Sequence, residues 1–170
     1  ELYRRAKVRS RAEPLPQLMA IIVRVGLMED PGTRFRYGES TSVLGRLVEV
    51  WSGQPLDEFF ERRIFTPLKM IDTGFVVRPA QKAQWTTVYT PAAGGGLEAS
   101  EVEDVPFTET PALLEGTVGL VASVPDYLRF CQMLLNHGEL DGVRLLRRET
   151  VEQMTGNGLS DAVLQQRRGS

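Results

Sequence analysis

The stretch PGTRFRYGES, residues 31–40, combines a turn, an alternating segment and a helix start within ten residues. The Pro-Gly pair is typical of a tight turn, and two arginines then alternate with Phe35 and Tyr37. If this segment is extended, both aromatic rings lie on one face. The arrangement is compatible with plain architecture, and it also suits a phenol that must be aimed at a reacting group.

Outward from this stretch, apolar residues at helical spacing predict helices on both sides. They recur over residues 14–27 and 41–52, and Pro55 opens a third helix with apolar residues on one side. Gly53 is the predicted stop of the 41–52 helix. The apolar residues of that helix are Val43, Leu44, Leu47, Val48 and Trp51, and its candidate caps are Ser40, Thr41 and Ser42.

The middle of the chain, residues 76–116, shows no clear period. It contains three consecutive glycines, followed by six acidic residues with no basic one: Glu98, Glu101, Glu103, Asp104, Glu109 and Glu115. No Lys-Ser or Lys-Thr pair follows the glycines, so they are not a phosphate-binding loop. We expect a long, exposed, acidic loop with short strands.

Regular structure is predicted again after residue 119. Ser123 and Asp126 have the spacing of a capping box, and a strong apolar stripe follows at Tyr127, Phe130, Cys131, Leu134 and Leu135. Gly138 is the predicted stop of this helix, the sequence ELDG predicts a turn, and RRETVEQM predicts the start of a further short helix.

Composition excludes several classes of protein. The 170 residues suffice for one domain with a core, and the net charge of -2 gives no field for nucleic-acid binding. No apolar run reaches the roughly 18 residues of a membrane span. With one cysteine and one histidine, an internal disulfide and a structural zinc site are both excluded, and we expect no metal and no cofactor.

Tyr37 is the first candidate for chemistry. A phenol has a reference pKa of about 10, so its ionisation near pH 7 costs roughly 4 kcal/mol, which a nearby cation must offset. The structural alternative is a buried ring with a satisfied hydroxyl. The remaining reactive side chains are predicted to be structural: His137 and Asp126 as helix caps, Cys131 as core, and Asp72 and Asp141 as turn residues.

Two long stretches carry a family resemblance. PGTRFRYGESTSVLGRLVEVWSGQPLDEFFERRIFTPLKMIDTGF, residues 31–75, and GLVASVPDYLRFCQMLLNHGELDGVRLL, residues 119–146, resemble the serine beta-lactamase-like superfamily, with its class C beta-lactamase and DD-peptidase fold. They are most similar to the family VIII carboxylesterases. The resemblance implies an α+β parent with a helical subdomain against an antiparallel sheet. We expect this chain to be mostly α-helical, with four to six helices, few short strands and a long irregular middle.

The resemblance also implies a role for Tyr37, which falls on the family's catalytic tyrosine, next to a Ser-x-x-Lys pair. In that family the serine attacks a carbonyl, and tyrosine and lysine move its proton. This sequence has no Ser-x-x-Lys and nothing like the family's third motif. Thr66 and Lys69 have the spacing, but they lie within the match to another segment. Gly38 and Glu39 replace the usual serine and asparagine.

We therefore expect a fragment whose neighbouring segments, before residue 1 and after 170, belong to a longer parent. Residues 1–116 are then the helical subdomain with the tyrosine and the acidic loop (76–116), and residues 117–170 lead into the α/β domain. The parent is expected to be a serine hydrolase that takes a small-molecule ester or acyl substrate, with Tyr37 as general base or proton relay and substrate-binding residues unassigned.

This chain alone is expected to be inactive. If it were active, the nucleophile would be Thr66, Ser40 or Ser42. The alternative is a non-catalytic helical module that binds a partner or dimerises through exposed apolar helix faces. We expect no nucleic-acid partner and no membrane span. The single cysteine is compatible with a cytoplasmic location, which is our expectation.

Overall fold

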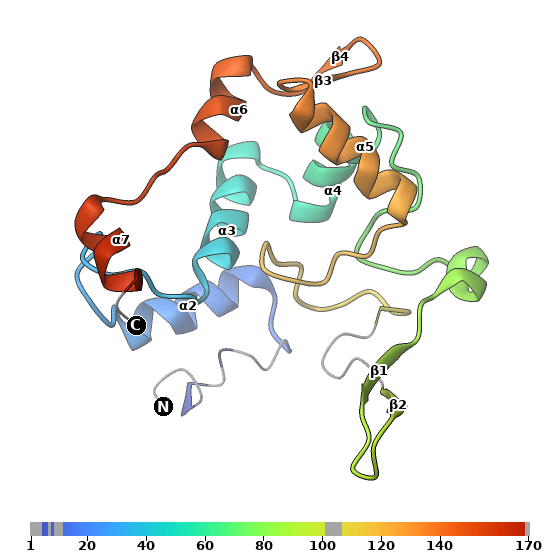
Figure 1. The fold of residues 1–170 in the computed structure, drawn as a ribbon, viewed down its shortest axis with the longest axis horizontal. Coiled ribbons are helices and arrows are strands. Elements are labelled where there is room, and N and C mark those ends of the chain that lie inside the picture. The colour runs from blue at the N-terminus through green and yellow to red at the C-terminus, as the bar shows by residue number, and fades with distance from the viewer. Residues whose placement is uncertain (1–4, 7, 9–11, 101–106, 169–170) are drawn as a thin grey trace.

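The structure is a computed structural model, and it describes residues 5, 6, 8, 12–100 and 107–168. The elements named here, drawn in Figure 1, are α2 Leu15–Val25, α3 Ser40–Ser52, α4 Leu56–Phe60, the π-helix Glu61–Phe65, the 3₁₀ helix Pro79–Gln84, β1 Val88–Pro91, β2 Leu97–Ser100, α5 Val124–Leu135, β3 Glu139–Leu140, β4 Val143–Arg144, α6 Arg148–Thr155 and α7 Asp161–Arg168.

The first two predicted helices are confirmed as α2 and α3. α3 ends where Gly53 adopts a left-handed backbone with φ of +69°, and the Gly53 N–H donates to the Glu49 carbonyl at 2.9 Å. The predicted hydroxyl cap of α3 is wrong. Glu39 occupies the N-cap and no side chain caps the helix, because Ser42 lies inside the first turn and makes hydrogen bonds elsewhere.

The apolar stripe predicted for α3 is only partly covered. Its buried residues are Ser42 and Gly45, whereas Leu44 and Trp51 are exposed. A small hydroxyl and a glycine are buried here because another backbone segment approaches α3 at these positions. The buried face of α3 therefore packs closely against the backbone at Gly116 and against the Leu56 side chain.

The third predicted helix begins at Leu56, directly after Pro55, and continues into the π-helix Glu61–Phe65. Of the side chains on its apolar side, Leu56 is fully buried, and Phe60 and Ile64 are partly buried. The fully packed members of the larger core cluster lie further along, at Phe65, Leu68, Met70 and Met133. This cluster joins the π-helix to α5.

The predicted capping of α5 is confirmed, because the Asp126 N–H donates to the Ser123 hydroxyl at 3.4 Å. The predicted stripe is wrong at two positions, since Tyr127 is 60% and Leu135 73% exposed. The Asp126 carboxylate accepts hydrogen bonds from the Asp72 N–H and the Thr73 hydroxyl, at 2.7 and 2.9 Å. These bonds turn Asp126 inward, so the buried face of α5 is shifted from the predicted one.

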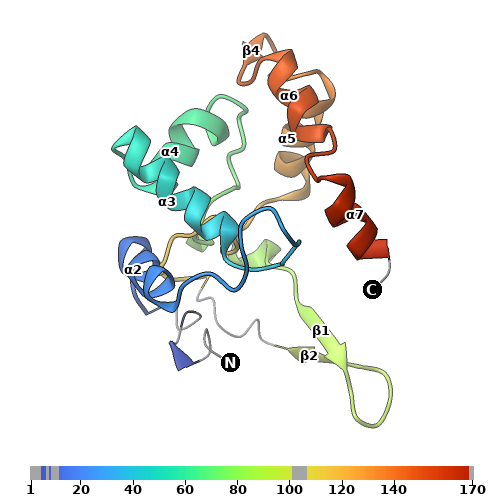
Figure 2. The same ribbon diagram turned by 90° about the vertical axis from the view of Figure 1, so that its left-hand side faces the viewer.

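The middle of the chain contains the short strands that were expected, together with a 3₁₀ helix that was not. A 3₁₀ helix, Pro79–Gln84, precedes an antiparallel hairpin in which Val88 pairs with Ser100 and Pro91 with Leu97. The hairpin projects away from the helices in both views (Figures 1 and 2). Of the acidic residues, Glu101, Glu103 and Asp104 lie outside the described residues. The end of this segment packs inward, because Leu113 contributes to a second core cluster with Val8, Leu15 and Leu18.

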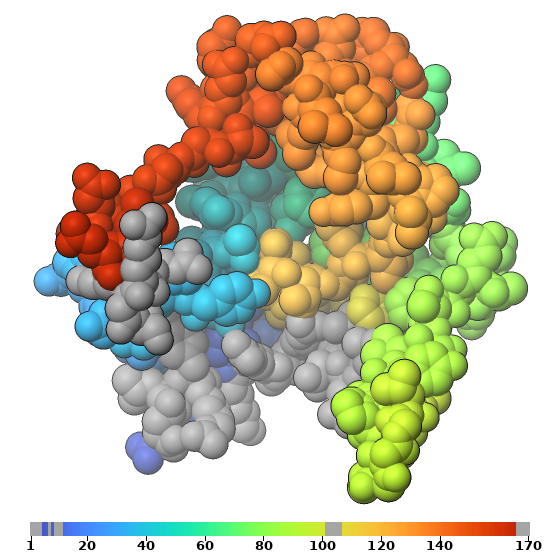
Figure 3. All heavy atoms as spheres, viewed as in Figure 1, coloured from blue at the N-terminus to red at the C-terminus, as the bar shows by residue number. Residues whose placement is uncertain are grey.

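The C-terminal part begins with a tight hairpin. The predicted ELDG turn is confirmed as the connection between β3 and β4, with Asp141 and Gly142 at φ of +51° and +78°. The predicted short helix is α6, and the last helix, α7, was not predicted. In Figure 3 the atoms of α3 lie recessed behind the chain that joins α6 to α7.

The expected fold class is confirmed: the chain is mostly helical, with two short antiparallel strand pairs as its only named sheets within the described residues. The described residues form six named α-helices, α2 to α7, which agrees with the four to six expected, and a short π-helix and a short 3₁₀ helix add to them. The division at residue 116 stays a prediction. No helix in the described part of the chain has the length and apolar character that a membrane span requires.

Candidate active site

The turn before Tyr37 is a β-turn over residues 30–33. The Thr33 N–H and hydroxyl both donate to the Asp30 carbonyl, at 3.2 and 2.7 Å. Gly32, the third residue of the turn, has φ of +80°, in the left-handed region that type II turns require there. The predicted Pro-Gly turn is thus confirmed, and two bonds from one residue close it.

An ion pair between Arg36 and Glu29 holds the segment that follows the turn. The Arg36 Nη2 donates to Glu29 Oε1 at 2.6 Å, and Arg36 Nε lies 3.1 and 3.2 Å from the two Glu29 oxygens. Arg34 adds a longer contact to Glu29 at 3.4 Å. The hydrogen bond from Arg36 holds the pKa of the Glu29 carboxyl below its usual value, and raises the pKa of Arg36. This clasp ties the residue before Tyr37 to the far side of the turn.

Tyr37 follows the clasp in irregular backbone, so residues 35–37 do not form a strand. Its side chain is 87% exposed, and the interpretation as a buried ring is wrong for this chain. Among the described residues little packs on the ring, and α3 begins only at Ser40. The phenol is therefore open to a molecule or segment approaching from outside the described residues.

Directly after Tyr37, the first turn of α3 contains a buried polar network. Ser42 is completely buried, and its hydroxyl donates to Glu115 Oε2 at 2.6 Å, with Glu39 Oε2 further away at 3.4 Å. Thr117 makes a short hydrogen bond with the same hydroxyl. Because Ser42 gives its single proton to Glu115, Thr117 donates to Ser42. Thr41 in turn lies 3.1 Å from the Thr117 hydroxyl. The hydroxyls of Thr41, Thr117 and Ser42 thus form a hydrogen-bonded chain that ends at the Glu115 carboxylate.

Two glycines let the segment of Glu115 reach α3. A Cβ on Gly116 would lie 2.4 Å from the Thr41 carbonyl oxygen, and one on Gly45 would lie 3.1 Å from both the Gly116 nitrogen and a Leu56 methyl. At Gly116 only glycine permits this approach, and at Gly45 a Cβ would be tightly packed. The prediction that Glu115 lies in an exposed loop is wrong, since Glu115 is only 6% exposed. The two leucines directly before it were the one local sign of burial.

The alternative nucleophiles lie in different surroundings. Ser42 has no exposed surface, so a substrate cannot reach its hydroxyl. Ser40 is exposed at the first position of α3. The Thr66 hydroxyl donates to Glu61 Oε1 at 2.8 Å. The hydrogen bond from Arg129 is the main cause that lowers the pKa of the Asp141 carboxyl, and Lys69 lies close enough to add to it. The Thr66 proton is thus directed to a carboxylate rather than to Lys69.

The other residues that were predicted to be structural include His137 and Cys131. His137 lies in the left-handed region after α5, where its N–H donates to Leu134 and the next N–H, of Gly138, donates to Met133, both at 2.9 Å. Its predicted place at the helix C-terminus is confirmed. Cys131 is a half-buried free thiol. Within the described part of the chain, no group of three or more His, Cys, Asp or Glu side chains could hold a metal ion.

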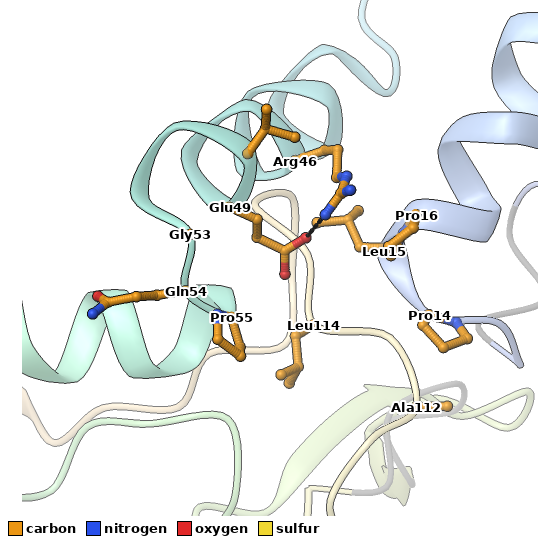
Figure 4. Close-up of a pocket in the computed structure, with 11 residues that line it drawn as sticks. Pro14, Leu15, Pro16, Arg46, Glu49, Gly53, Gln54, Pro55, Ala112 and Leu114 are labelled. Atoms are coloured by element: carbon orange, nitrogen blue, oxygen red, sulfur yellow. Dashed lines mark hydrogen bonds and ion pairs between the residues drawn. The ribbon is translucent and has the colours of Figure 1, made fainter.

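One open cleft of about 410 Å³ lies between the start of α2, the second half of α3, the start of α4 and residues 112–114 (Figure 4). Arg46 and Glu49 face each other in it, with Nη1 and Oε2 2.9 Å apart. Glu49 also accepts a hydrogen bond from the Leu56 N–H at 3.3 Å. These charges are satisfied within the protein, and Tyr37 is not among the lining residues. The cleft is therefore not the candidate active site.

Comparison with known proteins places this geometry in context. An uncharacterized protein of Mycobacterium tuberculosis is 33% identical over 143 residues, which cover 84% of this chain and 35% of that protein. The ML-236A carboxylate methylbutanoyltransferase of Penicillium citrinum is 28% identical over 129 residues, 75% of this chain and 29% of that protein. The chain thus spans about a third of the length of these curated relatives.

The fold itself is shared with solved structures. EstCE1, a hydrolase with promiscuous acyltransferase activity, is 24% identical and superposes with a TM-score of 0.74, over 88% of this chain and 42% of that chain. The family model described as Beta-lactamase matches residues 2–169. Because this match extends over nearly the whole sequence and agrees with the observed fold, the chain belongs to the Beta-lactamase family.

Proposed function

We propose that this chain is the tyrosine-bearing part of a serine hydrolase that acts on ester or related acyl substrates through an acyl-enzyme, with Tyr37 as general base or proton relay. The observation that carries the proposal is the position of Tyr37: 87% exposed, directly after an ion-paired turn and directly before α3, in a chain of this family. A proton relay must come within hydrogen-bond reach of the reacting atoms, and the exposed phenol of Tyr37 is accessible for that.

The chemistry needs groups that this sequence does not supply. A phenol with a pKa near 10 becomes a base at neutral pH only beside a cation, at a cost of roughly 4 kcal/mol otherwise. None of the three lysines follows a serine at the Ser-x-x-Lys spacing. We propose that the nucleophilic serine and its lysine come from sequence outside these residues. The 170-residue chain alone is then inactive.

An ester or acyl substrate is favoured by the related proteins. The Penicillium relative is a methylbutanoyltransferase, and EstCE1 is a hydrolase with acyltransferase activity. Both descriptions involve transfer of an acyl group, either to water or to another acceptor. The proposed partner of the parent enzyme is accordingly a small molecule with an ester or related acyl group.

A second candidate is a non-catalytic module that binds a partner or dimerises. It is favoured by two helices that carry large exposed apolar side chains: Val43, Leu44, Val50 and Trp51 on α3, and Val124, Tyr127, Leu128 and Leu135 on α5. The reading frame around the chain separates the two proposals. A continuous frame with Ser-x-x-Lys upstream supports the enzyme, and a start codon before residue 1 with a stop after residue 170 supports the module.

The direct test is hydrolysis of a chromogenic short-chain ester such as 4-nitrophenyl acetate. The 170-residue chain, its Tyr37→Phe variant and a Tyr127→Phe control should all show no turnover above buffer. In the polypeptide extended along its reading frame to include Ser-x-x-Lys, Tyr37→Phe should lower kcat by about 10²–10⁴-fold, the usual contribution of a general acid–base group, while Tyr127→Phe should not. Equal activity of extended wild type and Tyr37→Phe would refute the role of Tyr37.

A further inference from the structure

We propose that Glu115 is a positioning residue for Tyr37, acting through the buried hydroxyl of Ser42 and the first turn of α3. This inference rests on the proposed function, in which the Tyr37 phenol must be held where it can move a proton. Glu115 does not touch the reacting atoms. It lies in the segment between the projecting hairpin and α5, 78 residues after the tyrosine it is proposed to fix.

The need for such a residue follows from the exposure of Tyr37. No packed core holds its ring, so its position depends on the backbone at either end of a short segment. Before it, Arg36 is clasped to Glu29. After it, a Cβ placed on Gly38 would meet nothing within 4 Å, and the chain then enters the α3 N-cap at Glu39. The second anchor must therefore be the first turn of α3 itself.

Glu115 provides that anchor from outside the helix. Its Oε2 accepts the Ser42 proton at 2.6 Å, inside a region where Ser42 is completely buried and Glu115 nearly so. A carboxylate is costly to bury, and the same segment buries an apolar side chain, Leu113, two residues earlier. What a carboxylate adds over an apolar residue is direction: a short charge-assisted bond fixes how the helix turn is oriented.

The glycine contact makes this bond effective. The backbone at Gly116 lies against the Thr41 carbonyl so closely that a Cβ would not fit, which sets the distance between the two segments. The Ser42–Glu115 bond, supported by the Thr117 hydroxyl, then sets their relative rotation. The distance and the relative rotation of the two segments together fix one arrangement of the first turn of α3. Tyr37 lies three residues before that turn begins.

The test measures backbone order at Tyr37 and does not depend on turnover. We would record ¹⁵N relaxation order parameters for Tyr37, Gly38 and Glu39 in the 170-residue chain and in four variants. Ser42→Ala and Glu115→Ala remove the bond, while Glu115→Gln keeps an acceptor oxygen for the Ser42 proton. The matched control is Asp126→Ala, which removes an equally buried carboxylate that holds residues 72–73 instead.

In the wild type and in Glu115→Gln, the order parameters of the three amides should stay near about 0.85, the value of rigid backbone. In Ser42→Ala and Glu115→Ala they should fall below about 0.6. Asp126→Ala should leave them unchanged while it lowers stability. Unchanged values in Ser42→Ala, which removes only one buried oxygen, would overturn the proposal, as would equal losses in Asp126→Ala. Because no substrate is used, this result and the ester assay can fail independently.

Discussion

The contact between Gly116 and α3 gives a sharp prediction for Gly116→Ala. The added Cβ would lie 2.4 Å from the Thr41 carbonyl oxygen, 0.6 Å inside the 3.0 Å limit that real Cβ contacts respect. Overpacking typically costs about 1–3 kcal/mol, and here the opposing atom belongs to helix backbone, which cannot rotate away. We therefore expect a loss of about 2–3 kcal/mol in the free energy of unfolding, and a Tm lower by about 4–12 °C for a chain of this size.

Urea denaturation followed by circular dichroism measures this loss, with the m-value checked for a constant denatured state. Gly94→Ala in the β1–β2 connection is the matched control, since a Cβ there meets nothing within 4 Å. It should change the free energy of unfolding by less than about 0.5 kcal/mol. A loss below about 0.5 kcal/mol in Gly116→Ala, or an equal loss in both variants, would refute the inference that this close backbone approach exists in solution.

Three further predictions follow from single contacts. Asp126→Ala should lower the free energy of unfolding by about 1–3 kcal/mol, because the Asp72 N–H loses its acceptor; an unchanged urea midpoint would contradict that role. His137→Gly should raise it by about 1 kcal/mol, since φ of +57° suits glycine, and a lower thermal midpoint would count against this. The hydrogen bond from Arg36 lowers the pKa of Glu29 in the folded protein, so this ion pair stabilises the fold above the pKa of the unfolded chain, and the stabilisation is lost as the pH falls through the folded-state pKa. In a carboxyl NMR titration, Arg36→Ala should return the Glu29 pKa toward its usual value. An unchanged pKa would disprove the ion pair.

The helices could be predicted because their signals are local. Periodic apolar residues and the stops at Gly53 and Gly138 lie within the elements themselves, and they place α3 and α5 within a residue or two. The faces of those helices could not be predicted in the same way. Which side of α5 is buried depends on Asp126 bonding to residues more than 50 positions away, and no periodicity within the helix records that partner.

The candidate site, too, could be predicted only in part from the sequence. Tyr37 could be selected from the sequence because a turn, an aromatic alternation and a helix start surround it, and the family resemblance covers that stretch. Its exposure could not, since the same pattern fits a buried ring. Glu115 was not predicted as a site residue. It lies in an acidic, aperiodic segment, and nothing near it in the sequence indicates that Ser42, 73 residues earlier, donates a hydrogen bond to it.

Local chain chemistry alone specifies the turn at residues 30–33, the positions of α2, α3 and α5, the start of α6, and the hairpin turn at Asp141. These features depend on backbone preferences and on neighbours within a few positions, which the sequence states directly. The tertiary fold alone assigns the buried network behind Tyr37 and the exposure of the phenol itself. The buried network depends on the close passage of Gly116 past α3, and a contact between distant segments is set by the packing of the whole chain.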